Sequence, residues 1–119
     1  MKIIKGFKQK SISNIKLKVL RLSINDDYVK IDIGFTYSNN KKNILRITDD
    51  IILSSEATDY KFIKSIGVEV NTDVILKSKV DFKYFSLVFE PIAKGLEALI
   101  IKQNAKTEIN IKITELPLI

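Results

Sequence analysis

Apolar and polar side chains alternate along most of this chain with a period of two, which is typical of β-strands. The alternation is clearest over residues 15–24 and 28–37, and Asn25-Asp26-Asp27 supplies turn-forming residues between them. This arrangement predicts a β-hairpin. The alternating apolar residues are Ile15, Leu17 and Val19 at the start of the first strand and Val29, Ile31, Ile33 and Phe35 in the second.

The alternation changes phase within two predicted strands. After Val19 the apolar residues move from odd to even positions, beginning at Leu20. A slip of one residue would send every later side chain to the wrong face of the sheet, and a β-bulge near Val19–Leu20 corrects it. The same change between Tyr84 and Phe85 predicts a second bulge, and Gly67 marks a third candidate.

Shorter segments predict the remaining strands. They cover residues 44–48, 60–70, 74–76, 80–89 and 109–113, while 51–53 fits a weaker strand or an irregular stretch and 96–102 fits a strand or a short helix. About seven to nine short strands joined by polar turns, with no long helical stretch, predict an all-β fold, namely an immunoglobulin-like antiparallel β-sandwich. We expect a single domain over residues 1–119.

The net charge of +6 is unevenly distributed. Residues 1–21 carry seven basic side chains and no acidic one, whereas the other 98 residues carry 13 basic and 14 acidic groups. Lysine outnumbers arginine 18 to 2, and the A/T-rich codons of Lys, Ile and Asn can contribute to that excess. The position of the charge is therefore more informative than its amount.

The composition argues against the commonest catalytic and metal sites. The chain has no His and no Cys, so it lacks the residues for a Ser-His-Asp triad, an imidazole base or the usual zinc site. Its four glycines are far apart and form neither a P-loop nor a dinucleotide-binding motif. A carboxylate-pair hydrolase stays open as a class, but no spacing selects a pair. We expect a protein that is not an enzyme and needs no cofactor.

Two acidic pairs are candidate calcium ligands. If residues 15–24, 28–37 and 44–48 form an up-and-down meander, the pairs meet at one end of the sheet, where four carboxylates suit calcium. The simpler interpretation is that Asp favours turns, so we expect no metal. The candidate residues are Asp26, Asp27, Asp49 and Asp50.

Two segments combine aromatic and basic side chains, as single-stranded nucleic-acid-binding proteins do. One is Tyr60-Lys61-Phe62 with Lys64, and the other runs from Lys79 to Tyr84. Core packing is the commoner role for aromatic residues on alternating strands, and arginine, which reads bases and phosphates best, is scarce. Nucleic-acid binding is therefore the alternative function and not the leading one.

Residues 1–11 form either a basic arm or the first edge strand. As a helix, the segment would place its apolar residues on one face and suit an anionic membrane surface, although Gly6 weakens that helix. As an extended arm, it would set apolar anchors into a neighbouring protein, with lysines at the rim. The candidate partner-binding residues are Lys2, Ile3, Ile4, Lys5, Phe7, Lys8 and Lys10.

The segment Phe85-Ser86-Leu87-Val88-Phe89-Glu90-Pro91-Ile92-Ala93-Lys94-Gly95, followed by an apolar strand and by residues 109–116, carries one resemblance. It is similar to the strand, F-x-P-I/L, turn, strand pattern of immunoglobulin-like accessory domains of bacterial proteins. The resemblance implies a binding or scaffolding module without catalytic residues, so no site residue is carried over from it.

Together these observations favour a non-enzymatic β-sandwich that acts through protein–protein contacts. It would serve as an assembly subunit of a virion or a secretion machine, or as an accessory interaction module, with a protein partner or a second copy of itself. The alternative is a small basic module, OB-like, that binds single-stranded nucleic acid or another anionic surface. No apolar run is long enough for a signal peptide or a membrane span, so we expect a cytoplasmic protein or one within an assembled particle.

Overall fold

The computed structural model describes residues 1–56, 58–93, 95–104 and 107–117. These residues form strands and connecting turns, and none of them is helical, so the predicted all-β class is confirmed. The predicted turn at 93–95 includes Lys94, which lies outside the described residues. The described strands are β1 (Lys2–Ile4), β2 (Lys8–Ser11), β3 (Lys16–Ile24), β4 (Val29–Thr36), β5 (Ile44–Leu45), β6 (Ile52–Ser55), β7 (Thr58–Ile66), β8 (Val74–Ile75), β9 (Phe82–Phe89), β10 (Leu99–Asn104) and β11 (Glu108–Thr114).

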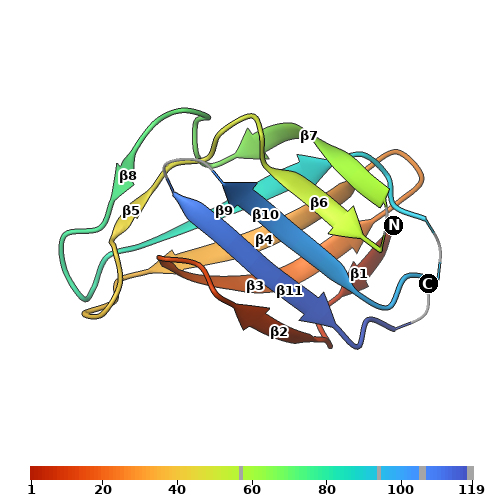
Figure 1. Cartoon of the computed structure of the whole chain (residues 1–119), viewed down its shortest axis with the longest axis horizontal. Helices are drawn as coiled ribbons and strands as arrows, with labels where there is room; N and C mark the ends of the chain where they lie inside the picture. The colour runs from red at the N-terminus through yellow and green to blue at the C-terminus, as the bar shows by residue number, and fades with distance from the viewer. Residues whose placement is uncertain (57, 94, 105–106, 118–119) are drawn as a thin grey trace.

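Nine of these strands form one antiparallel sheet in the order β1-β3-β4-β9-β7-β6-β10-β11-β2. The sheet curls so that β6, β10 and β11 lie over β3, β4 and β9, with the apolar core between them (Figure 1). β7 makes the turn between the two layers, because its first residues pair with β6 and its last residues pair with β9. In the part of the chain that the structure describes, no helix is long and apolar enough to cross a membrane.

The predicted hairpin and its bulge are confirmed. β3 and β4 pair from Lys16↔Thr36 to Ile24↔Val29, and the register shifts between Val19 and Arg21. Leu17 and Val19 point into the core before the shift and Leu22 after it, while Leu20 is 41% exposed. The bulge therefore keeps both apolar phases of β3 buried and leaves Leu20 beside Arg21 on the outward face.

The second predicted bulge is wrong. β4 and β9 pair without interruption from Val29↔Phe89 to Thr36↔Phe82, so the strand does not slip between Tyr84 and Phe85. Because side chains alternate along an unbroken strand, Phe85 is buried and Phe82 and Tyr84 point outward. The prediction failed because it assumed that every aromatic residue of this strand belongs to the core.

The bulge suggested at Gly67 is also misplaced. The register shift of β7 lies between Phe62 and Lys64, and Gly67 follows the end of the strand with a φ of +91°. A Cβ at Gly67 would stand 3.2 Å from the backbone oxygen of Tyr84. Glycine is needed here for a left-handed backbone that passes close to β9.

The N-terminal segment belongs to the sheet at both of its ends. β1 pairs with the end of β3, from Lys2↔Ile24 to Ile4↔Leu22, and β2 pairs with β11. The side-chain amide of Gln9 joins the two edges of the curled sheet: it accepts a bond from Val19 N–H at 2.7 Å and donates to Val19 C=O at 2.8 Å. This arrangement corresponds to the edge-strand alternative for residues 1–11.

The third strand of the predicted meander does not form as expected. Only Ile44–Leu45 of the 44–48 segment is a strand, and it pairs with β8 in a separate two-stranded ribbon instead of extending the sheet beside β4. The ambiguous segment 96–102 contributes to β10, and the final strand lies where it was predicted, as β11.

Candidate binding face

The outward face of β3, β4, β9 and the end of β7 combines exposed apolar rings with lysines. Strand pairing places Lys16, Thr36 and Phe82 in one row across three strands, and Lys18, Gly34 and Tyr84 in the next row. A third row brings together Arg21, Asp32, Ser86 and Ile66. We call this surface the β3–β4–β9 face; its outward charged residues are Lys16, Lys18, Arg21, Lys30, Asp32 and Lys64, and Lys5 borders it.

Phe82 and Tyr84 form an exposed aromatic pair on this face. Their side chains are 58% and 60% exposed, and their ring centroids lie 4.9 Å apart at a tilt of 40°. The Tyr84 ring rests on Gly34, where an added Cβ would stand 3.3 Å from the ring atom Cε1, and Leu20 lies close to the same position. A sheet glycine under an aromatic ring holds that ring against the backbone while leaving its outer side open to solvent.

Shallow hollows lie on the two sides of Tyr84. One, of about 520 Å³, extends past Leu20 and Arg21 to Ile66 and Lys5. The other, of about 460 Å³, extends past Leu20 to Lys16 and Lys18. Tyr84 and Leu20 border both hollows, so a chain-like ligand could follow this surface from one to the other.

Asp32 is the acidic residue among the outward charged residues of this face, and it already forms ion pairs with Arg21 and Lys30. Its carboxylate accepts hydrogen bonds from Arg21 Nε and, at 2.5 Å, from Ser86 Oγ, and it lies 3.8 Å from Lys30 Nζ. Burial raises the pKa of Asp32, but the hydrogen bonds from Ser86 and Arg21 and the charges of Lys30 and Arg21 outweigh it, so the pKa falls below its ordinary value. Six cations lie on or beside this face; two of them, Arg21 and Lys30, pair with the ionised Asp32, and Asp27 borders the face beside Lys30 and Lys64.

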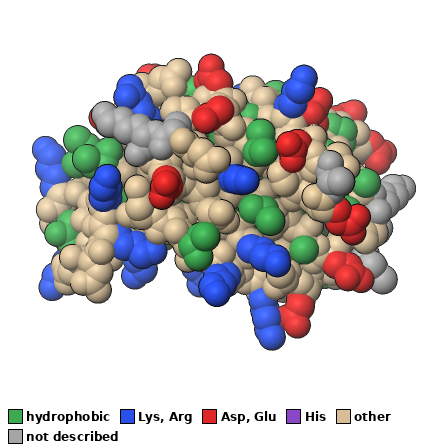
Figure 2. Space-filling model, in the orientation of Figure 1, with side chains coloured by type: hydrophobic (Ala, Val, Ile, Leu, Met, Phe, Trp, Pro, Cys, Tyr) green, Lys and Arg blue, Asp and Glu red, His purple; other side chains and the backbone are tan. Residues whose placement is uncertain are grey.

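The opposite side of the molecule has a different character. Figure 2 shows the β6–β10–β11 side, where acidic and basic side chains are interspersed. Lys102 and Lys112 stand on outward positions of this side and are exposed. A mixture of both signs produces little net field, whereas a face with an excess of cations attracts anions.

The calcium candidates are not brought together as a site. Among the described residues, no group of three or more Asp, Glu, His or Cys side chains could hold a metal ion. Asp27 donates its backbone N–H to Asn25 Oδ1 in the β3–β4 turn, and Asp50 accepts a hydrogen bond from Thr48 Oγ1. Asp26 and Asp49 are exposed beside them. The expected meeting of the two pairs is wrong because β5 leaves the sheet instead of returning beside β4.

The two aromatic–basic segments differ in the burial of their aromatic side chains. Tyr60 is buried, and Phe62 is half-buried with its ring edge-to-face against Phe89 at 5.8 Å, so this segment packs into the core. Phe82 and Tyr84 are exposed instead. The core role proposed for Phe82 is therefore wrong, and its segment provides the aromatic part of the β3–β4–β9 face.

The candidate partner-binding residues of the N-terminal segment divide by burial. Ile4 is 3% exposed, and Phe7 is partly buried against the same core. Ile3 is 54% exposed, and the lysines of the segment are exposed as well: Lys2, Lys5, Lys8 and Lys10. Ile4 and Phe7 thus contribute to this chain's own core.

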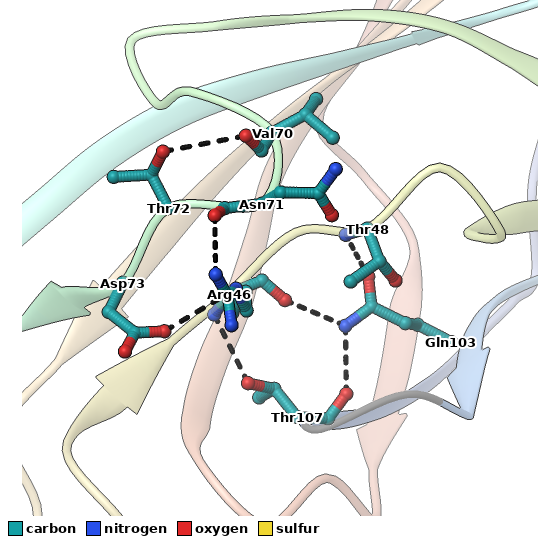
Figure 3. Close-up of polar contacts among 8 residues, drawn as sticks. All are labelled: Arg46, Thr48, Val70, Asn71, Thr72, Asp73, Gln103 and Thr107. Atoms are coloured by element: carbon teal, nitrogen blue, oxygen red, sulfur yellow. Dashed lines mark hydrogen bonds and ion pairs between the residues drawn. The ribbon is translucent and has the colours of Figure 1, made fainter.

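The most enclosed polar cluster has a structural role. Gln103, which is 1% exposed, donates to the carbonyl oxygens of Arg46 and Thr107 at 2.8 Å each and accepts from Thr48 N–H at 2.9 Å (Figure 3). Arg46 in turn donates to Asn71 C=O at 2.6 Å. These bonds use the Gln103 amide to satisfy irregular backbone, so the cluster fastens residues 46–48 to β10.

The sequence pattern did not indicate Leu20, Gly34 or Ile66 as parts of the face. One signal was present: an unbroken strand over 82–89 places two aromatic residues outside.

Comparison with known proteins adds no identification, because no family model, curated protein or solved structure matches this chain.

Proposed function

We propose that this chain is a non-enzymatic binding module that holds a polyanion on the β3–β4–β9 face. The observation that carries the proposal is the charge balance of that face, where six cations on or beside the face outnumber two carboxylates, the paired Asp32 and the bordering Asp27. A row of lysines beside an apolar groove attracts a polyanion through counterion release and contacts it through the lysine head groups.

Binding of a labelled heparin oligosaccharide, measured by fluorescence anisotropy at several salt concentrations, tests the proposal. We expect binding that weakens steeply with salt. The double variant Lys16→Thr/Lys18→Thr should lower the affinity roughly 20-fold at ~0.1 M salt, taking for each lost contact the change of about 0.7 in the slope of log K against log salt that single-stranded nucleic acids show. Threonine keeps the β-strand preference at both positions.

Lys102→Thr/Lys112→Thr is the matched control, because it removes two exposed strand lysines from the opposite side and lowers the net charge equally. The control should bind heparin nearly as well as the unaltered protein. Equal losses in the two variants would mean that net charge alone drives binding. No binding at ~0.05 M salt would end the proposal.

A protein–protein function is the second candidate, and half-exposed Ile3 on the edge strand β1 favours it. In that case the chain is an assembly subunit or an accessory module, and its exposed N-terminal lysines surround Ile3. The immunoglobulin-like form of the β-sandwich belongs to this candidate and remains a prediction. Its test is the change in residues 1–11 described in the Discussion.

A further inference from the structure

Building on the proposed polyanion-binding function, we infer that the ligand is single-stranded nucleic acid, with bases stacked on Tyr84 and Phe82 and phosphates held by the flanking lysines. To bind a simple polyanion, the face needs only positive charge. The β3–β4–β9 face also presents two rings to solvent, which charge does not require.

The rings are built into the face as an open platform. Both are more than half exposed, and they lie on the half of β9 that pairs with β4 but extends past the end of β7, whose pairing with β9 stops at Ile66↔Ser86. Tyr84 is supported from below by Gly34, which offers no side chain, so the ring is fixed in position while its outer side stays open. An exposed aromatic pair costs free energy in water and is a common mark of a binding site.

The arrangement suits adjacent nucleotides. Phe82 and Tyr84 are two residues apart on one strand, and their rings lean together with centroids 4.9 Å apart, so they present one joint aromatic surface. Aromatic side chains on the open face of a sheet stack two or three unpaired bases in RNA-recognition domains, and stacking tolerates any base because every base has a π-face.

The cations lie where a backbone would pass. Lys16 and Lys18 stand in the same rows as Phe82 and Tyr84, with only Thr36 and Gly34 between them on β4. Leu20, Gly34 and Thr36 line the hollow between Tyr84 and these lysines. Two strand spacings, about 10 Å, separate β9, which carries the rings, from β3, which carries the lysines. This distance leaves room for a base at the rings and its phosphate at the lysines.

The same features disfavour a duplex and a base-specific site. Bases inside a duplex are stacked on each other, so they cannot stack on Tyr84. Lysines dominate the face, and a lysine recognises a phosphate as a point charge without the fixed donor geometry that reads a base edge. We therefore expect sequence-tolerant binding of single strands.

The test uses the full chain and three probes: a fluorescein-labelled oligothymidylate of about 12 nucleotides, a duplex of the same length, and heparin. Tyr84→Ala should weaken oligothymidylate binding about 5- to 150-fold, the range of one lost stacking contact, and change heparin binding less than about twofold. Tyr84→Phe keeps the ring and should retain most of the affinity. Ile75→Ala, an exposed apolar residue on the β5–β8 ribbon, is the matched control and should have no effect.

Each other outcome has a defined meaning. If Tyr84→Ala leaves oligothymidylate binding unchanged, or the duplex binds as tightly as the single strand, the inference is wrong. If heparin binds and oligothymidylate does not, the inference is wrong while the polyanion proposal stands. If none of the three probes binds, the proposed function itself fails.

Discussion

At the scale of single residues, small differences in position separate structural from surface roles. Phe82 and Phe85 are three residues apart on one strand, yet one is 58% exposed and the other 4%. Glycine matters at two places next to them: Gly34 leaves space for the Tyr84 ring, and Gly67 takes a backbone conformation that other residues rarely adopt. Asp32 is the charged group whose environment sets a testable pH dependence.

Asp32→Asn should lower the melting temperature at pH 7, because it removes a carboxylate that Arg21, Ser86 and Lys30 stabilise. The pKa of Asp32 is lower in the folded protein than in the unfolded chain, so its contribution is present above about pH 4 and is lost as the pH falls through the folded pKa. Thermal unfolding followed by circular dichroism at pH 7 and pH 3 checks this.

The difference in melting temperature between the unaltered protein and Asp32→Asn should shrink at pH 3. Asp26→Asn, which changes an exposed turn residue, serves as the control.

The variant Asp32→Asn should also bind heparin more tightly at pH 7, since it frees Arg21 and Lys30. A melting temperature equal to that of the unaltered protein at pH 7 would contradict the structural role of the carboxylate.

At the scale of elements, the N-terminal segment closes the fold. β1 pairs with one end of β3, β2 pairs with β11, and Gln9 bridges from β2 to Val19 between them. Ile4 and Phe7 contribute side chains to the core between these strands. The segment therefore protects the two edges that would otherwise be open to pairing with another chain.

Deletion of residues 1–11 should unfold the protein or lower its stability severely, because it removes two strands and the core contacts of Ile4 and Phe7. The variant Lys8→Ala/Lys10→Ala removes charge from the same segment without touching these contacts and should stay folded. Circular dichroism and size-exclusion chromatography with light scattering distinguish the outcomes. A deletion variant that keeps its fold but loses an oligomer would instead support docking through the arm.

At the scale of the whole molecule, one sheet encloses one core. The apolar residues of both layers form a single cluster that extends from Ile15 and Leu45 at the ribbon end to Leu99 and Leu116. The small β5–β8 ribbon joins this body through Leu45 and the Gln103 cluster instead of standing apart. Continuous packing of this kind couples distant strands during unfolding.

We expect urea unfolding in a single transition, with midpoints by circular dichroism and by tyrosine fluorescence that agree. The chain has no Trp, so its four tyrosines supply the fluorescence; Tyr37 directly follows β4, whereas Tyr60 lies in β7. An earlier transition seen by only one probe would contradict this and show that a part of the fold unfolds independently. Repeating the experiment with Gln103→Leu, which removes the three hydrogen bonds of this buried side chain, should shift the midpoint to lower urea.

The local pattern predicted well those elements that depend on nearest neighbours. The β3–β4 hairpin, its bulge at Val19–Leu20 and the final strand follow from alternation and turn residues. The prediction failed at β9, where apolar residues occupy both faces, and at the meander, where the partner of β5 is 30 residues away at β8. Hydrophobicity indicates that a residue can be buried, but the pairing of strands decides which face is covered.

The sequence by itself therefore determined an all-β chain with its basic residues concentrated at the start and without the residues of common catalytic sites. Only the tertiary structure decided that Ile4 and Phe7 belong to the core and that Lys16 and Lys18 stand beside an exposed aromatic pair. The physical reason is that charge and alternation are local properties of the chain. A binding face forms when long-range strand pairing places residues more than 60 positions apart in the same row.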